Sequence, residues 1–197
     1  MAYSKLTMTR PLLILISGAP GTGKTVLAQK LATALPAVVL EKDAIKENLF
    51  DSLGEGDREW SRKLGAATFD LLYMLVERLL MAGQSVVAEA AFTREYAARW
   101  IERMGRKYDF DVLELHCHTD LDTALRRYVE RAESDERHSG HGSGISPEAI
   151  ADELRGQYAR YGPITDGVRL VRIDTTDFSA VDYDEIVDIA RKSLGTT

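Results

Sequence analysis

Residues 12–25 read LLILISGAPGTGKT, and this stretch decides the fold. An apolar run that predicts a buried strand passes at Gly18 into the pattern G-x-x-x-x-G-K-[ST], and a helical pattern follows from Lys24. Glycines allow a tight turn and the close approach of an anion to the backbone. Successive amide groups then form an anion-binding nest at the positive end of the helix. The stretch therefore predicts a cradle for nucleotide phosphates; the alternative is an ordinary glycine-rich turn between strand and helix.

Two side chains at the end of the motif carry its chemistry. Lys24 is long enough to reach β- and γ-phosphate oxygens, and the hydroxyl of Thr25 is a ligand for Mg²⁺. We therefore expect ATP and Mg²⁺ as cofactors. The residues of the motif expected to bind the nucleotide are Gly18, Gly21, Thr22, Gly23, Lys24 and Thr25.

Outward from the motif, short apolar runs alternate with longer amphipathic ones. Strands are expected at 12–17, 37–40, 85–88, 112–116 and 168–173, and helices at 24–35, 43–50, 60–81, 94–104, 121–132, 146–161 and 181–194. Strands that are each followed by a helix predict an α/β fold with a parallel sheet covered on both faces. Residues 133–145 are rich in Gly, Ser, His and charge, and we expect them to form a mobile lid within a single domain that spans 1–197.

The composition narrows the class of protein. The 197 residues include 25 Lys and Arg against 31 Asp and Glu, and the net charge of −6 argues against coating DNA or an anionic membrane through bulk charge. Cys117 is the only cysteine, so an intrachain disulfide and a Cys-rich zinc site are excluded. The apolar runs are too short for a signal peptide or a membrane span, which favours a cytoplasmic protein without a membrane partner. The oligomeric state stays open.

Through the glycine-rich motif and the alternating layout, the chain resembles the P-loop kinase group. That group includes adenylate, gluconate and shikimate kinases, chloramphenicol phosphotransferase, zeta toxins and polynucleotide kinases. The resemblance covers most of the chain in layout, and the P-loop is its specific motif. It implies a three-layer P-loop NTPase fold: a five-stranded parallel sheet in the order 2-3-1-4-5, with helices on both faces and a lid.

A carboxylate follows the second predicted strand, where a phosphoryl acceptor would need orientation. Asp43 and Lys46 resemble the D-x-x-R element of polynucleotide and antibiotic kinases, with lysine in place of the usual arginine. The resemblance implies that Asp43 binds the acceptor hydroxyl or acts as its base, and that Lys46 contacts the substrate. The lysine weakens the case for bidentate recognition of phosphate. Alternatively, Asp43 only caps its helix.

Glu89 follows the third predicted strand. The carboxyl ends of parallel strands face the ligand crevice, so we expect Glu89 to lie near the γ-phosphate and the water shell of Mg²⁺. It resembles the acidic residue of a degenerate Walker B strand; a solvent-facing glutamate is the alternative. Phe92, together with Phe50 and Trp60, could wall a substrate pocket or simply belong to the core.

Four arginines, Arg126, Arg127, Arg131 and Arg137, fall within twelve residues before and inside the expected lid. Arg127 and Arg131 are spaced i, i+4 and share one helix face. The resemblance implies that one arginine stacks on adenine and another reaches phosphate, and both Arg126 and Arg127 stay candidates for the stacking role. Arg137 is expected to contact the substrate, and the loop at Asp174 to border adenine. A solvated, ion-paired helix face is the alternative.

Together these inferences predict an ATP-dependent phosphotransferase that moves the γ-phosphate to a hydroxyl of a small molecule. The expected catalytic residues are Lys24, Asp43, Glu89, Arg127 and Arg131. A nucleotide-binding ATPase or switch without an acceptor is one alternative, and it would usually need a complete Walker B strand. A polynucleotide 5′-hydroxyl kinase is another, and it would need a basic channel. A toxin-like kinase that acts on a nucleotide-sugar also stays open.

Overall fold

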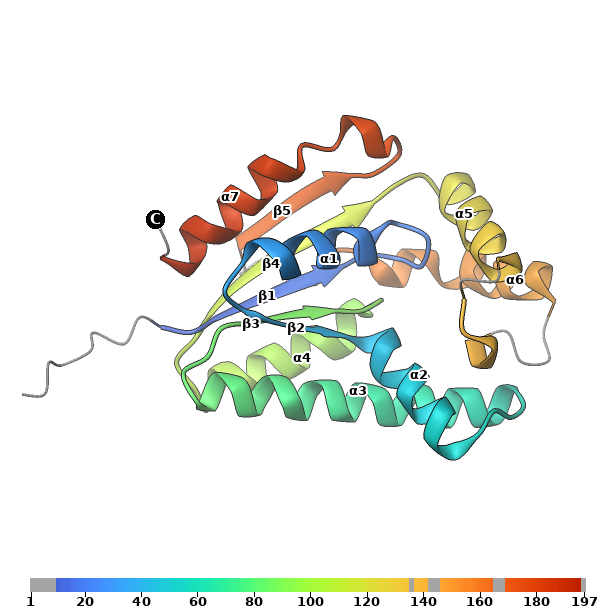
Figure 1. Cartoon of the computed structure of the whole chain (residues 1–197), viewed down its shortest axis with the longest axis horizontal. Coiled ribbons are helices and arrows are strands. Elements are labelled where there is room, and N and C mark those ends of the chain that lie inside the picture. The colour runs from blue at the N-terminus through green and yellow to red at the C-terminus, as the bar shows by residue number, and fades with distance from the viewer. Residues whose placement is uncertain (1–9, 135–136, 142–145, 165–168, 196–197) are drawn as a thin grey trace, which may run out of the picture.

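One parallel sheet organises the molecule. The computed structural model describes residues 10–134, 137–141, 146–164 and 169–195. Within them, five strands lie in the order β2-β3-β1-β4-β5, which confirms the predicted topology (Figure 1). The strands are β1 (Leu12–Ser17), β2 (Val38–Glu41), β3 (Val86–Glu89), β4 (Asp111–His118) and β5 (Arg169–Asp174).

The helices lie close to the predicted ranges. The α-helices are α1 (Lys24–Ala34), α2 (Lys42–Leu53), α3 (Arg58–Met81), α4 (Arg94–Gly105), α5 (Leu121–Glu133), α6 (Pro147–Gln157) and α7 (Tyr183–Leu194), and short 3₁₀ helices are η1 (Ser139–His141), η2 (Tyr158–Tyr161) and η3 (Phe178–Ala180). Helix α3 begins two residues earlier than predicted because the carboxylate of Asp57 accepts a hydrogen bond from the Trp60 amide. Helix α7 begins two residues later than predicted because Asp182 caps it in the same way.

The central strand β1 is buried on both faces, and its alternating side chains separate two core clusters. Ile14 and Ile16 pack with residues of α1 and α7 on one side of the sheet. Leu13 and Leu15 pack with residues of α3 and α4 on the other side. Figure 1 shows these two helix layers with the sheet between them. This three-layer arrangement fixes the strand ends rigidly relative to one another.

The carboxyl ends of the strands meet at one edge of the sheet. Ile16 pairs with Glu89, and Glu89 pairs in turn with Glu41, so the P-loop, the end of β3 and the start of α2 leave the sheet side by side. Helices α2, α5 and α6 extend beyond this edge (Figure 1). A separate small cluster around Leu125 and Leu154 joins α5 to α6. Across the described ranges, none of the helices combines the length and the apolar character needed to cross a membrane.

Candidate active site

A cavity of about 760 Å³ lies at the carboxyl edge of the sheet, and residues of the P-loop, α2, α3, β3, α5, η1 and η3 are among those that line it. Its wall carries seven cationic side chains, which are Lys24, Lys42, Lys46, Arg58, Arg127, Arg131 and Arg137. Only three carboxylates oppose them among the lining residues: Asp43, Glu89 and Glu130. The cavity is therefore electropositive in a chain whose net charge is −6, which suits an anionic ligand.

Glycines shape the P-loop because other residues would not fit there. Gly18, Gly21 and Gly23 have φ values of 133°, 82° and 76°, which L side chains rarely adopt. A Cβ atom at Gly18 would lie 2.1 Å from the carbonyl oxygen of Cys117, and one at Gly21 would lie 2.3 Å from that of Ala124. The loop thus packs its backbone directly on β4 and α5, and this is the conformation that a phosphate cradle needs.

Lys24 begins α1 inside this cradle. Its side chain is buried, and Nζ donates a hydrogen bond to the carbonyl oxygen of Ala19 at 2.7 Å. Burial lowers the pKa of Lys24, and the nearby carboxylate of Glu89 opposes that shift. Thr25 lines the cavity beside it. A phosphate oxygen could replace Ala19 as the partner of Nζ, so the cradle fits the phosphates of ATP.

Glu89 is the last residue of β3. It lines the same cavity as Lys24 and is only 5% exposed. Burial raises the pKa of Glu89 to about 7, although Lys24 pulls it downward. In nucleotide sites Mg²⁺ is held by one or two protein oxygens, with phosphate oxygens and water completing the octahedron. Thr25 and Glu89 fit that pattern, Glu89 through water. Nowhere in the described ranges do three His, Cys, Asp or Glu residues gather as a metal site of their own.

Asp43 lies on the acceptor side of the cavity, in the first turn of α2. Its carboxylate accepts a hydrogen bond from Lys42 Nζ at 3.0 Å. Burial works to raise the pKa of Asp43, but the charges of Lys42 and Lys24 hold it well below its usual range, so the carboxylate stays ionised. The N-cap position belongs to Glu41, which makes no side-chain capping bond. The alternative that Asp43 serves as the helix cap is therefore wrong.

Arg127 closes the cavity beside the β5–α7 loop. Its guanidinium donates hydrogen bonds to the carbonyl oxygens of Thr175 and Thr176, at 2.9 and 3.0 Å, and stacks on the ring of Phe178 at 4.0 Å. Phe178 in turn lies so close to Gly23 that a Cβ atom there would be 2.4 Å from the ring. Arg127 thus ties α5 to the loop and to the P-loop.

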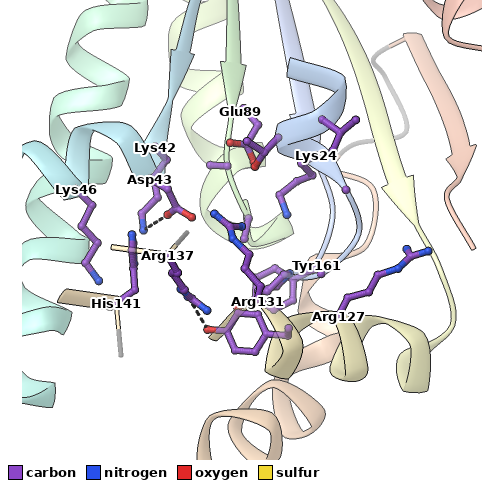
Figure 2. A pocket seen from close by; sticks show the side chains of 18 of the residues that line it. Lys24, Lys42, Asp43, Lys46, Glu89, Arg127, Arg131, Arg137, His141 and Tyr161 are labelled. Carbon is purple, nitrogen blue, oxygen red and sulfur yellow. Dashed lines mark hydrogen bonds and ion pairs between the residues drawn. The ribbon is translucent and has the colours of Figure 1, made fainter. Parts of the chain in front are cut away.

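Arg131 and Arg137 approach the cavity from the lid side. Figure 2 shows Arg131 reaching from α5 toward Lys24, with Arg137 beside Asp43. Arg137 donates to the hydroxyl of Tyr128 at 3.3 Å and lies over its ring. Of the predicted lid 133–145, residues 135–136 and 142–145 lie outside the described residues. The described remainder includes η1, whose Gly140 packs on Phe50 of α2.

The structure places several predicted site residues away from the cavity wall. Arg126 does not line the cavity; it is 60% exposed and pairs at 3.1 Å with Glu130, which does. The carboxylate of Asp174 accepts a hydrogen bond from the Thr176 amide in the loop after β5. Phe92 is buried among Phe69 and Tyr73, so its alternative assignment to the core fits its surroundings. Gly18 and Thr22 shape the P-loop from behind and do not line the cavity.

Other cavity features have no local sequence signal. Thr175 donates a hydrogen bond that the carbonyl oxygens of Thr22 and His118 share, at 3.1 and 3.0 Å, and so fixes the β5 loop to the P-loop. Phe178 and Tyr161 reach the wall from positions far along the chain. Ser61 from α3 accepts a hydrogen bond from Lys46. Phe178, Tyr161 and Ser61 belong to no motif. Thr175 follows Asp174 in the loop expected to border adenine, but only the tertiary structure reveals its contact with the P-loop.

A phosphate cradle, an acidic strand end and arginines that converge from a helix above the sheet define a P-loop nucleotide-binding protein of the kinase type. The chain belongs to the AAA domain family, whose profile matches residues 13–155. A comparison with curated proteins found no significant match.

Solved structures support this assignment. The chain is similar to a protein of Chloroflexus aurantiacus J-10-fl provisionally described as a kinase, with 34% identity, a TM-score of 0.84, and coverage of 94% of this chain and 100% of that one. A gluconokinase from Sinorhizobium meliloti 1021 shares the fold at 20% identity and a TM-score of 0.53, over 94% of this chain and 93% of that one. The APS kinase of Mycobacterium tuberculosis, solved in complex with AMPPNP and APS, also shares the fold. Its identity is 19% and its TM-score 0.56, and the match covers 95% of this chain and 99% of that one. The predicted kinase-group fold is thus confirmed.

Proposed function

We propose that this protein is an ATP-dependent phosphotransferase that moves the γ-phosphate of ATP to a hydroxyl group of a small molecule. The observation that carries the proposal is the cavity itself, which joins a phosphate cradle to an ionised carboxylate. Lys24 and Asp43 are close enough for each charge to shift the pKa of the other group. A γ-phosphate held at Lys24 would therefore lie next to a hydroxyl held at Asp43.

Phosphoryl transfer asks the protein mainly for positioning and for neutralisation of charge. Asp43 would accept a hydrogen bond from the acceptor hydroxyl and take its proton as the new P–O bond forms. The bond to the bridging oxygen of the diphosphate leaving group breaks in the same step. Lys24 and Arg131 would stabilise the charge on the oxygens of the transferred group. Mg²⁺ bound near Thr25 would neutralise the phosphates further.

The nucleoside part of ATP would lie beyond the P-loop, where Arg127 and Phe178 form the wall. Arg127 already uses two guanidinium nitrogens on loop carbonyls. Its outer face can still stack on a base, which suits the flat, delocalised guanidinium. We assign the stacking role to Arg127 because it lines the cavity, whereas Arg126 does not and is held in an ion pair with Glu130.

The two alternatives fit this geometry less well. An ATPase switch without an acceptor would not need an electropositive wall beyond Asp43, yet Lys46 and Arg137 line that part. A polynucleotide kinase must follow a backbone of several phosphates. The cavity volume of about 760 Å³ instead matches a compact ligand beside ATP. The proposal keeps residues 133–145 as the lid of a single domain, and it places the protein in the cytoplasm, where ATP is available.

The two halves of the proposal can be separated with two variants. Lys24→Ala removes the phosphate contact, so stabilisation by AMPPNP and Mg²⁺ in thermal unfolding should disappear. Asp43→Asn keeps the size but removes the proton acceptor. It should bind AMPPNP about as well as the unchanged protein while kcat with an accepting compound falls by roughly 10²–10⁴. Unchanged AMPPNP affinity in a folded Lys24→Ala protein, or normal turnover in Asp43→Asn, would contradict the respective half.

A further inference from the structure

Two donor atoms of the Arg137 guanidinium are buried and make no hydrogen bond. Its Nε and Nη1 atoms have no hydrogen-bond partner among the described residues, and Nη2 reaches only the Tyr128 hydroxyl. Leaving buried donors of a charged group unpaired is costly. The side chain lines the cavity, so a rotation of the guanidinium toward the cavity would bring these donors to a ligand there. The planar fork of arginine is suited to the oxygens of a phosphate, sulfate or carboxylate.

Lys46 presents a second buried cation to the same end of the cavity. It is 8% exposed, and its Nζ donates to Ser61 Oγ at 2.9 Å and lies 5.1 Å from the centre of the Phe50 ring. No carboxylate of the described chain lies within ion-pair distance of Nζ. Burial lowers the pKa of Lys46 to about 8, and the neighbouring charge of Lys42 adds to the shift. Burying the charge of Lys46 without a carboxylate partner costs free energy, and an anionic ligand bound beside it would offset that cost.

The other cations of this end already have partners. Lys42 pairs with Asp43 at 3.0 Å, and Arg58 pairs with Glu153. Figure 2 shows Lys46, His141 and Arg137 gathered around the Asp43 end of the cavity, with Lys24 on the far side. The charges of Arg137 and Lys46 both act on His141, whose pKa burial and these cations lower to about 4, although Asp43 opposes them. The imidazole is therefore neutral, and the surplus positive charge at this end belongs to Lys46 and Arg137.

We propose that Lys46 and Arg137 form a subsite for an anionic group on the acceptor, so that the substrate is a hydroxyl compound that also carries a phosphate, sulfate or carboxylate. The inference rests on the proposed function, in which the hydroxyl is held at Asp43. Asp43 and Lys46 lie one turn apart on α2 and therefore share a helix face, with Cβ atoms about 5–6 Å apart. The anionic group would then lie only a few bonds from the reacting hydroxyl.

Inorganic sulfate tests the subsite in the absence of any known acceptor. The protein is first saturated with AMPPNP and Mg²⁺, so that the P-loop is occupied, and sulfate is then titrated at constant ionic strength by calorimetry. We expect saturable binding of one sulfate. Absence of saturable sulfate binding to the AMPPNP-loaded protein would overturn the inference. Absence of AMPPNP binding in the first step would instead contradict the proposed function, so the two failures are distinguishable.

Variants locate the bound anion. Lys46→Met and Arg137→Gln should each weaken sulfate binding about tenfold or more, because each removes a charge-assisted contact, while AMPPNP binding stays within about twofold. Lys63→Met and Arg106→Gln are matched controls, because both side chains are exposed, each pairs with a glutamate four residues earlier in the chain, and both lie outside the cavity. Equal sulfate affinity in Lys46→Met, Arg137→Gln and these controls would overturn the assignment.

Matched acceptors then separate the possible sources of the anion. Phosphate transfer from ATP is measured with a neutral sugar or polyol, its monophosphate and its sugar acid. At least one anionic form should be phosphorylated at least ten times more efficiently than the neutral parent, and Arg137→Gln should remove most of that preference. Preference for the monophosphate or for the sugar acid identifies the group. Equal or better use of the neutral parents would overturn the proposal.

Discussion

At the residue scale, the P-loop end of the cavity holds two buried ionisable groups whose pKa values burial shifts in opposite directions. Burial lowers the pKa of Lys24 and raises that of Glu89, while the attraction between them opposes both shifts. Before ligands bind, such a pair is held in an environment that neither charge favours on its own. We interpret this as a site kept ready for phosphate and Mg²⁺, whose charges would complement the two side chains.

The raised pKa of Glu89 predicts a pH-dependent cost to stability. From its usual value of 4.5 the pKa rises to about 7 in the fold, so ionising Glu89 costs folding free energy. This cost is absent below about pH 4.5, grows as the pH rises toward 7, and is complete above it. Glu89→Gln does not ionise. Its free energy of unfolding relative to the unchanged protein should therefore rise between pH 5 and pH 8, by at most about 3 kcal/mol.

Urea unfolding without nucleotide at the two pH values measures this difference. The gain should fall short of the ceiling because pH 5 already lies above the usual pKa of 4.5, so part of the cost is present at the lower pH. Glu95→Gln is a suitable control, since Glu95 is exposed and pairs with Arg99 on α4. A difference between Glu89→Gln and the unchanged protein that is the same at both pH values, or larger at pH 5, would contradict the assigned shift.

At the element scale, α2 links the acceptor side of the cavity to the described part of the predicted lid. Gly140 of η1 packs on the ring of Phe50, and His138 stacks on the same ring at 5.6 Å. His138 also contacts Asp51, and His141 contacts Glu47, each at 3.1 Å. These contacts join residues about ninety positions apart. They explain how a segment between α5 and α6 reaches the helix that carries Asp43.

This packing predicts a specific effect of a methyl group. A Cβ atom at Gly140 would lie 2.5 Å from the Phe50 ring, so Gly140→Ala should loosen η1 from α2 or lower the free energy of unfolding by about 1–3 kcal/mol. Gly156→Ala in α6 is the control: its Cβ would meet nothing within 4 Å, and alanine favours a helix by up to about 1 kcal/mol. Denaturant unfolding and hydrogen exchange of residues 137–141 measure both effects. Unchanged stability together with unchanged exchange in Gly140→Ala would contradict the packing.

Helices, strands and motifs that depend on neighbouring residues could be predicted from the sequence. Contacts between residues far apart in the chain could not. The P-loop carries its turn, its anion nest and its lysine within eight residues, and the alternation of strands and helices fixes which ends face the ligand. Asp43 and Glu89 could therefore be placed at the cavity, although their roles stay predictions. Phe178 and Thr175 reach the P-loop only because β5 lies two strands from β1 in the sheet. Arg126 and Arg127 are adjacent, and only the rotation of α5 decides which one faces inward.

At the scale of the whole molecule, charge is distributed unevenly. The chain carries a net charge of −6, whereas the lining of the cavity has seven cations against three carboxylates. An acidic exterior disfavours extended nucleic acid, and a positive cavity concentrates small anions at the carboxyl edge of the sheet. The three-layer core holds the P-loop and Glu89 in register, while the acceptor side depends on α2 and on the described part of the predicted lid. The nucleotide side of the cavity is thus built from the sheet and the P-loop motif, whereas the acceptor side is built from elements outside that motif.

The most direct measurement of the central claim follows the γ-phosphate of ATP. The protein is incubated with Mg²⁺ and γ-labelled ATP, alone and with pools of small hydroxyl compounds, neutral and anionic, or a single-stranded oligonucleotide, and the labelled products are separated. We predict label in a small hydroxyl compound, absent with Lys24→Ala and strongly reduced with Asp43→Asn. Label that appears only as inorganic phosphate, whatever acceptor is present, or at the 5′ end of the oligonucleotide, would contradict the account.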